Sequence, residues 1–186
     1  MVVEEKALAR RMRQKYKGSG YWVAARSDCL IVSDGEFVAE ISARQMPRKA
    51  LGLIAEHVGK IPTDGEAFYI RKGQCQTEIA AASGAFAAID RLERELESEE
   101  SRHYAKRTRL TVNGNRVWQR DDNLEIVLID PELEDMAIPM DKMENTAIRI
   151  GDGLYYEDDL SRLYINRTAM KEAAEQVKHL EMMQWA

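Results

Sequence analysis

The stretch from Arg109 to Leu133 constrains the fold of this chain more than any other. Short runs of β-favouring residues alternate in it with two turn-forming triplets, Asn113-Gly114-Asn115 and Asp121-Asp122-Asn123. Asn, Asp and Gly tolerate positive φ angles, so they favour tight connections between antiparallel strands. The stretch therefore predicts a β-meander, which indicates an architecture but no chemistry.

Similar strand and turn signals recur along the chain and are separated by helical patterns. Further strands are expected at residues 21–25, 29–33, 37–41, 67–71, 75–79, 147–150, 154–157 and 163–165. Helices are expected at 3–16, at 47–58, from 83 through the polar stretch ESEESRHYAKR, and at 168–183. Residues 131–143 predict one helical turn followed by a loop.

The order of these elements is repeated. Residues 22–105 and 109–184 each read as strand, turn, strand, helix or helical turn, hairpin and helix. We therefore expect an α+β protein of antiparallel hairpins with helices on one face of the sheet and two pseudo-repeated lobes. The expected units are a basic N-terminal helix at 1–20, a first lobe at 21–106 and a second at 107–186, or one continuous domain.

Composition narrows the class of protein. A chain of 186 residues can bury a core without disulfides or metals, and its two cysteines, Cys29 and Cys75, are too few for a disulfide framework or an all-cysteine zinc site. No apolar run approaches the roughly 18–20 residues of a transmembrane helix, and the N-terminus breaks its hydrophobicity with charge at once. We expect a cytoplasmic protein without membrane contact.

Charge is distributed unevenly along the chain. The net charge is −5, yet residues 1–17 carry a local balance of +4 and residues 121–160 one of −11. Such polarity can steer a charged partner. The basic groups that we expect to contact nucleic acid or a protein partner belong to the first helix and to the start of the helix at 47–58: Arg10, Arg11, Arg13, Arg44, Arg48 and Lys49.

Motifs of known chemistry are missing. The acidic pairs Asp121-Asp122 and Asp158-Asp159 stand where turns are expected, and adjacent strand residues point to opposite faces, so neither pair forms a two-carboxylate clamp. The histidines lie far apart on expected helices without an HExxH motif, and the glycine-rich turns lack Walker A or Rossmann spacing. No metal or cofactor is expected, and the sequence identifies no catalytic residue.

The element order resembles that of DNA sliding clamps, in which small sheet-and-helix units are fused into a ring. The resemblance covers most of the chain and includes the strand-to-helix phrases EISARQMPRKAL and IVLIDPELEDMA. It implies a non-enzymatic protein that encircles DNA, with basic residues on an inner helical face. The acidic residues at the corresponding place in the second unit depart from that pattern.

Three functions follow as hypotheses. The first is a non-catalytic binding or accessory protein, clamp-like and connected with DNA processing, that associates with itself or with a protein partner. The second is a metal-dependent hydrolase or nuclease that uses carboxylates of the acidic C-terminal half, at least two of which must converge from different strands. The third is a small-ligand domain with its cleft between the lobes.

Overall fold

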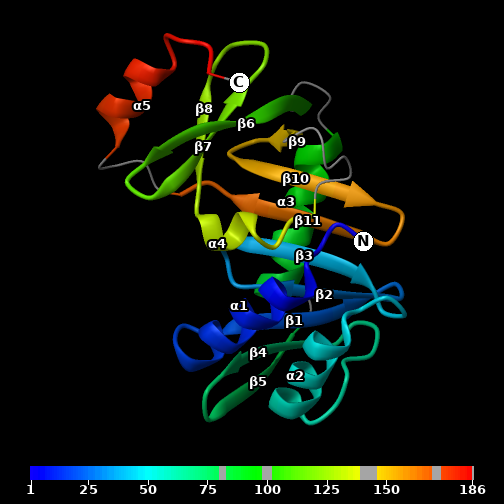
Figure 1. Ribbon diagram of the computed structural model, residues 1–186. Coiled ribbons are helices and arrows are strands. Elements are labelled where there is room, and N and C mark those ends of the chain that lie inside the picture. The colour runs from blue at the N-terminus through cyan, green and yellow to red at the C-terminus, as the bar shows by residue number, and fades with distance from the viewer. Residues whose placement is uncertain (80–82, 98–101, 139–145, 169–172, 186) are drawn as a thin grey trace.

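The computed structural model describes residues 1–79, 83–97, 102–138, 146–168 and 173–185. Its central element is one antiparallel sheet of eleven strands in the order β5-β4-β1-β2-β3-β11-β10-β9-β6-β7-β8 (Figure 1). The strands of the first half are β1 (Tyr21–Arg26), β2 (Cys29–Ser33), β3 (Phe37–Ser42), β4 (Ala67–Arg71) and β5 (Gln74–Glu78). Those of the second half are β6 (Arg102–Val112), β7 (Asn115–Arg120), β8 (Ile126–Ile129), β9 (Thr146–Ile150), β10 (Gly153–Asp158) and β11 (Ser161–Asn166).

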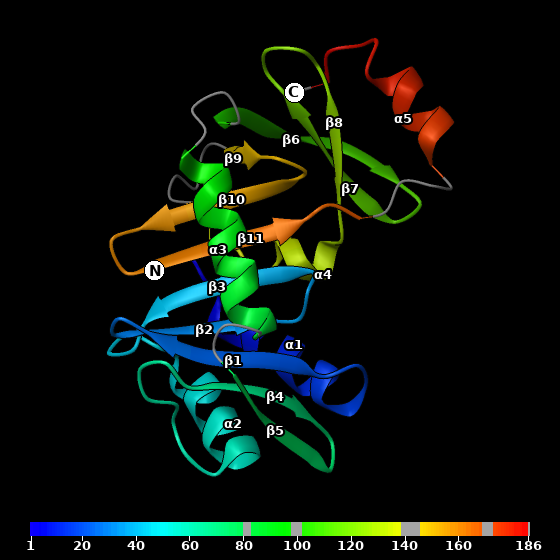
Figure 2. The ribbon, with the colours of Figure 1, turned by 180° about the vertical axis from the view of Figure 1, so that it is seen from behind.

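The described residues form five helices that pack on this sheet, and the expected α+β class is confirmed. They are α1 (Glu5–Lys17), α2 (Arg48–Val58), α3 (Gly84–Glu97), α4 (Pro131–Glu134) and α5 (Ala174–Leu180). The expectation that all helices lie on one face is wrong. Helices α1, α2 and α4 cover what we call the front side of the sheet, and α3 and α5 cover the back side (Figures 1 and 2).

The two sides are covered because the strands are apolar on both faces. In β2, Leu30 and Val32 belong to the front core, whereas Ile31 between them packs against the back helix α3. Successive strand residues point to opposite faces of a sheet, so a continuous apolar run needs a cover on each side. The run CLIVS therefore already contained the signal for two helical layers.

The repeat of element order is present in the sheet. The strands β5-β4-β1-β2-β3 and β10-β9-β6-β7-β8 follow one another in the same pattern, and β11 lies between the two sets. Pairing of β11 with β3 joins the sets into one sheet. The division into units 1–20, 21–106 and 107–186 stays a prediction, although β6 runs across the second of these boundaries.

The meander at 109–133 is confirmed, with different bounds. Asn113 and Gly114 have φ angles of 50° and 80° and form the tight turn between β6 and β7. The first strand, however, starts at Arg102, where a continuation of α3 was expected, and it places His103 in a strand. Pairing with β9 on one side and β7 on the other decides this conformation, which the polar sequence of the segment does not indicate.

The C-terminal helix is shorter than the expected 168–183. It spans Ala174–Leu180 and packs through Val177 on the apolar back faces of β7 and β8. Residues 169–172 lie outside the described part of the chain, as do Pro139, Met140 and Met143 of the expected loop.

Candidate functional site

Helix α1 begins and ends at residues suited to those positions. The Glu4 side chain accepts a hydrogen bond of 2.6 Å from the Ala7 amide, and the Gly18 amide donates to the Lys15 carbonyl. An acidic residue at the start and lysines in the last turn also complement the helix dipole. Leu8 and Met12 are fully buried in the front core. The helix is therefore anchored in the sheet by one face and presents the other to solvent.

The solvent face of α1 carries only cations and one amide. The exposed residues of this helix are Lys6, Arg10, Arg13, Gln14 and Lys17. We call the four cations the basic stripe. Their spacing of three or four residues places each about 4.5–6 Å along the axis from the next, over a length of about 16 Å. Among the described residues, only Arg10 has a carboxylate within 4 Å, that of Asp135 at 3.6 Å.

Helix α2 lies beside α1 and runs in the same direction. The Lys49 amide donates to the Glu5 carboxylate over 3.2 Å at the start of both helices, and the rings of Tyr16 and His57 stack at 3.8 Å near their ends. Burial lowers the pKa of His57, and the nearby Arg13 lowers it further against the opposite effect of Glu56. His57 also lies 2.8 Å from the Tyr21 hydroxyl, so it is part of the helix interface.

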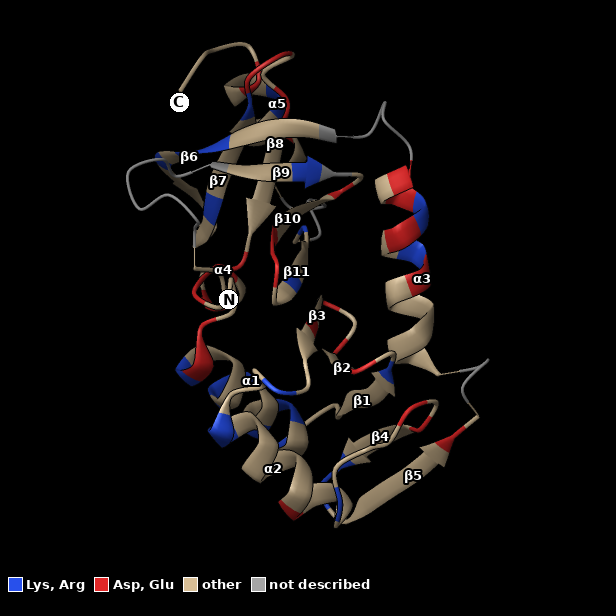
Figure 3. Ribbon diagram, turned by 90° about the vertical axis from the view of Figure 1, so that its right-hand side faces the viewer, with Lys and Arg blue, Asp and Glu red and all other residues tan. Residues whose placement is uncertain are grey.

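Three more cations stand on the same side of the molecule. Arg44, Arg48 and Lys49 are exposed in the loop before α2 and in its first turn. No described carboxylate forms an ion pair with any of these three side chains. Figure 3 shows basic residues along α1, whereas α3, on the opposite side of the sheet, mixes both signs of charge. The front side near α1 is therefore the basic pole of an acidic protein.

Arg11 does not belong to this surface. Its side chain is 8% exposed and its Nε atom donates to Asp34 Oδ2 over 2.7 Å, while the guanidinium also contacts Glu36. Burial by itself lowers the pKa of Arg11, but the two carboxylates outweigh it and raise that pKa. The Asp34 side chain is fully buried, and its carboxylate also accepts from the Glu36 and Phe37 amides. Arg11 therefore holds the β2–β3 turn against α1.

Several carboxylates of the acidic C-terminal half pair with arginines of the same half. Glu134 pairs with Arg107 and Arg116, at 3.2 and 2.9 Å, and Asp122 pairs with Arg120 and lies 3.0 Å from His103. In the described part of the chain, no three acidic, histidine or cysteine side chains are grouped so that they could hold a metal ion. The hydrolase hypothesis needs only two converging carboxylates, so it stays a prediction.

The ion pair of Glu125 makes the stability of the protein depend on pH. Arg149, 7% exposed, pairs with it through two nitrogens, one of them at 2.9 Å, and lowers the pKa of Glu125 from 4.5 to about 2. The unfolded chain then binds the proton more readily, so stability is lost as the pH falls from about 4.5 toward 2. In urea unfolding, Glu125→Gln should be less stable than the wild type at pH 6, and the difference should shrink at pH 3.

Glu132→Gln is the control for this prediction. Glu132 is exposed on α4, and no described cation pairs with its side chain. Its substitution should change the free energy of unfolding by less than about 0.5 kcal/mol at either pH. If the difference in free energy of unfolding between the wild type and Glu125→Gln stayed constant from pH 6 to pH 3, the lowered pKa of Glu125 would be contradicted.

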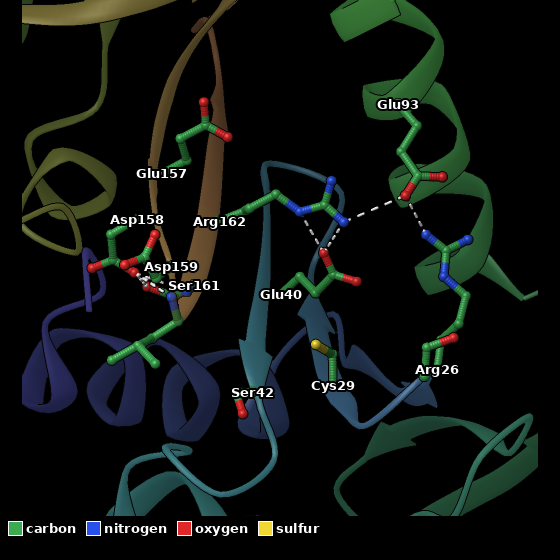
Figure 4. A pocket seen from close by; sticks show the side chains of 12 residues that line it. Arg26, Cys29, Glu40, Ser42, Glu93, Glu157, Asp158, Asp159, Ser161 and Arg162 are labelled. Atoms are coloured by element: carbon green, nitrogen blue, oxygen red, sulfur yellow. Dashed lines mark hydrogen bonds and ion pairs between the residues drawn. The ribbon is translucent and has the colours of Figure 1, made fainter.

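A cleft of about 520 Å³ lies where the two sets of strands meet (Figure 4). Four charged side chains form a chain of ion pairs across it. Glu93 accepts from Arg26 at 2.7 Å and from Arg162 at 3.4 Å, and Arg162 Nε donates to the buried Glu40 over 2.6 Å. Burial raises the pKa of Cys29 in this cleft and Glu40 adds to the effect, so the thiol stays protonated and is a poor nucleophile.

The structure thus sorts the six residues expected to make contacts. Arg10 and Arg13 share the basic stripe, Arg44, Arg48 and Lys49 lie exposed on the same side, and Arg11 is buried. Sequence reasoning did not select Lys6 and Lys17, which complete the stripe. Their spacing from Arg10 and Arg13 was visible in the sequence, but only the burial of Leu8 and Met12 shows which face of the helix meets solvent.

Among the described residues, the helices are all too short or too polar to cross a bilayer.

Comparisons with known proteins identify no relative of this chain. No protein-family model matches the sequence, and neither a curated protein nor a solved structure matches it.

Proposed function

We propose that this protein is a non-catalytic nucleic-acid-binding protein that contacts the phosphate backbone through the basic stripe. The observation that carries the proposal is the solvent face of α1, where four cations and one glutamine are exposed and no carboxylate is present. The acidic residues at the start of the same helix, Glu4 and Glu5, accept hydrogen bonds from backbone amides. In a chain of net charge −5, such a local concentration of cations favours the binding of an anionic partner.

A linear polyanion fits this surface better than a membrane does. Helices that bind at membrane surfaces insert an apolar face between the lipids. Here the apolar face of α1 is used in the core, where Leu8 is 0% and Met12 1% exposed, so nothing apolar remains for insertion. The cations follow one another along a line of about 16 Å. Lysine, arginine and glutamine are all common donors to phosphate oxygens.

The single ion pair on the stripe does not oppose this role. Arg10 and Asp135 are 56% and 46% exposed and 3.6 Å apart. Exposed pairs of this kind contribute only about 0–1 kcal/mol. A phosphate can therefore replace Asp135 as the partner of Arg10 at small cost, and all four cations of the stripe are available to the ligand.

The test is the salt dependence of binding to a fluorescently labelled DNA duplex of mixed sequence, measured by anisotropy. Four phosphate contacts predict a slope of about −3.6 in a plot of log K against log salt, or about a 100-fold loss of affinity between 50 and 200 mM salt. The variant Lys6→Gln/Arg10→Gln/Arg13→Gln/Lys17→Gln should bind at least 100-fold more weakly at 50 mM salt, with a slope near zero.

A control removes the same number of charges elsewhere. Its four substitutions lie on α3, β6 and α5 at exposed cations: Arg94→Gln, Lys106→Gln, Arg109→Gln and Lys178→Gln. This variant has the same net charge as the first, so it separates a local surface from a general charge effect. Equal binding by both variants, or no binding by the wild type at low salt, would overturn the proposal. Binding to anionic vesicles but not to DNA would overturn it as well. Encirclement of DNA in the manner of a clamp stays a prediction.

A further inference from the structure

The two edges of the sheet differ in how they are covered. At the β8 edge, the Thr168 amide donates to the Leu128 carbonyl over 2.8 Å, and the Glu181 carboxylate accepts from the Ile126 amide over 3.0 Å. The C-terminal segment therefore caps this edge. At the other end, β5 pairs only with β4, and no described residue forms a backbone hydrogen bond to its outer side.

The register shows which groups of β5 point outward. The Ala25 amide donates to the Glu66 carbonyl over 3.0 Å, so in β4 the backbone groups of Phe68 and Ile70 also face β1. Alternate residues of an antiparallel strand face opposite neighbours, so Ala67, Tyr69 and Arg71 face β5. Their partners there are Glu78, Gln76 and Gln74. The amide and carbonyl groups of Cys75 and Thr77 are consequently the ones that point away from the sheet.

We propose that β5 pairs with β5 of a second copy of this chain, antiparallel and centred on Gln76. In this register Cys75 lies opposite Thr77 of the second copy, and Thr77 opposite its Cys75. Both are outward-facing positions, so each pair exchanges two N–H···O bonds and the interface contains four. The two sheets become one continuous sheet.

The side chains of β5 favour β5 of a second copy as the strand that pairs with this edge. Glu78 is the one charged residue of the strand, and the register places it opposite Gln74, far from the Glu78 of the second copy. The strand has none of the lysines, prolines or bulges with which exposed edges are protected against pairing. Ile79, which follows the strand, is 79% exposed and is available to be covered by the second copy.

Sedimentation velocity over a concentration series tests the pairing, without nucleic acid. Thr77→Pro removes an outward amide from each copy, and proline is tolerated at an edge where the N–H faces solvent. Thr77→Ala keeps the backbone and is the matched control. We expect a concentration-dependent dimer for the wild type and Thr77→Ala, and a dissociation constant at least about 30-fold higher for Thr77→Pro, from the loss of two hydrogen bonds. Unchanged circular dichroism of Thr77→Pro shows that the monomer is folded.

Oxidative crosslinking tests the register. In the variant Cys75→Ser/Gln76→Cys, the two new thiols face each other across the axis of the dimer, and a disulfide should form. In Cys75→Ser/Gln74→Cys, the thiols are separated by about 13 Å along the strands, too far for a disulfide. Cys75→Ser alone measures the background from Cys29. A strictly monomeric wild type, a dimer unaffected by Thr77→Pro, or equal crosslinking of the two double variants would overturn the proposal.

Discussion

Replacing Arg11 by alanine should lower the free energy of unfolding by about 3–5 kcal/mol, because it leaves a buried carboxylate without its partner. The Asp34 side chain is 0% exposed, and Arg11 Nε lies 2.7 Å from its carboxylate. Lys15 remains 3.5 Å away and can compensate only in part. Urea unfolding at neutral pH, followed by circular dichroism, measures the loss.

Two variants of the same helix make this experiment specific. Arg13→Ala removes an exposed guanidinium two residues further along the helix and should change the free energy of unfolding by less than about 0.5 kcal/mol. Arg11→Lys retains the charge and should recover part of the lost stability. If Arg11→Ala and Arg13→Ala were equally stable, Arg11 would not have the structural role described here.

Replacing Trp118 by alanine should lower the free energy of unfolding by about 3–5 kcal/mol. Trp118 is 2% exposed and belongs to the front core together with Leu133, Met136 and Tyr156. Its removal leaves a cavity that the surrounding strands can close only in part. The same urea titration measures this effect, with the midpoint and the slope fitted separately.

The shape of this side chain matters more than its polar atom. The indole Nε1 is buried and has no hydrogen-bond partner in the described part of the chain, so Trp118→Phe loses volume alone and should cost clearly less than Trp118→Ala. Tyr104→Ala, on the neighbouring strand and 64% exposed, should have an effect below about 0.5 kcal/mol. A Trp118→Ala variant as stable as Tyr104→Ala would contradict the packing.

Local signals predicted the turns and most elements. The tight turn at Asn113-Gly114 requires residues that tolerate positive φ angles, and such residues are readable in sequence. The same holds for Gly59, which ends α2 with a φ angle of 86°. The strand that begins at Arg102 was not predicted, because its conformation depends on pairing with β7 and β9. Both of these strands follow it in the sequence, so a local reading of its residues does not indicate the pairing.

The basic stripe on α1 could be predicted from the sequence only in part. Sequence reasoning located a basic first helix, yet it could not separate Arg11 from Arg10 and Arg13. These residues differ in what the fold brings beside them: Asp34, at a separation of 23 residues in sequence, for Arg11, and solvent for Arg13. The pairing of the acidic half with its own arginines was hidden for the same reason.

By itself, the sequence determined the class of the fold, the repeated order of its elements and the basic character of α1, because turn chemistry, hydrophobic period and charge are local properties. The tertiary structure alone decided the order of the eleven strands, the cover on both sides of the sheet and the open edge at β5. It also decided which cations of α1 meet solvent. These features depend on contacts between residues far apart in sequence, whose free energies exist only once the sheet has formed.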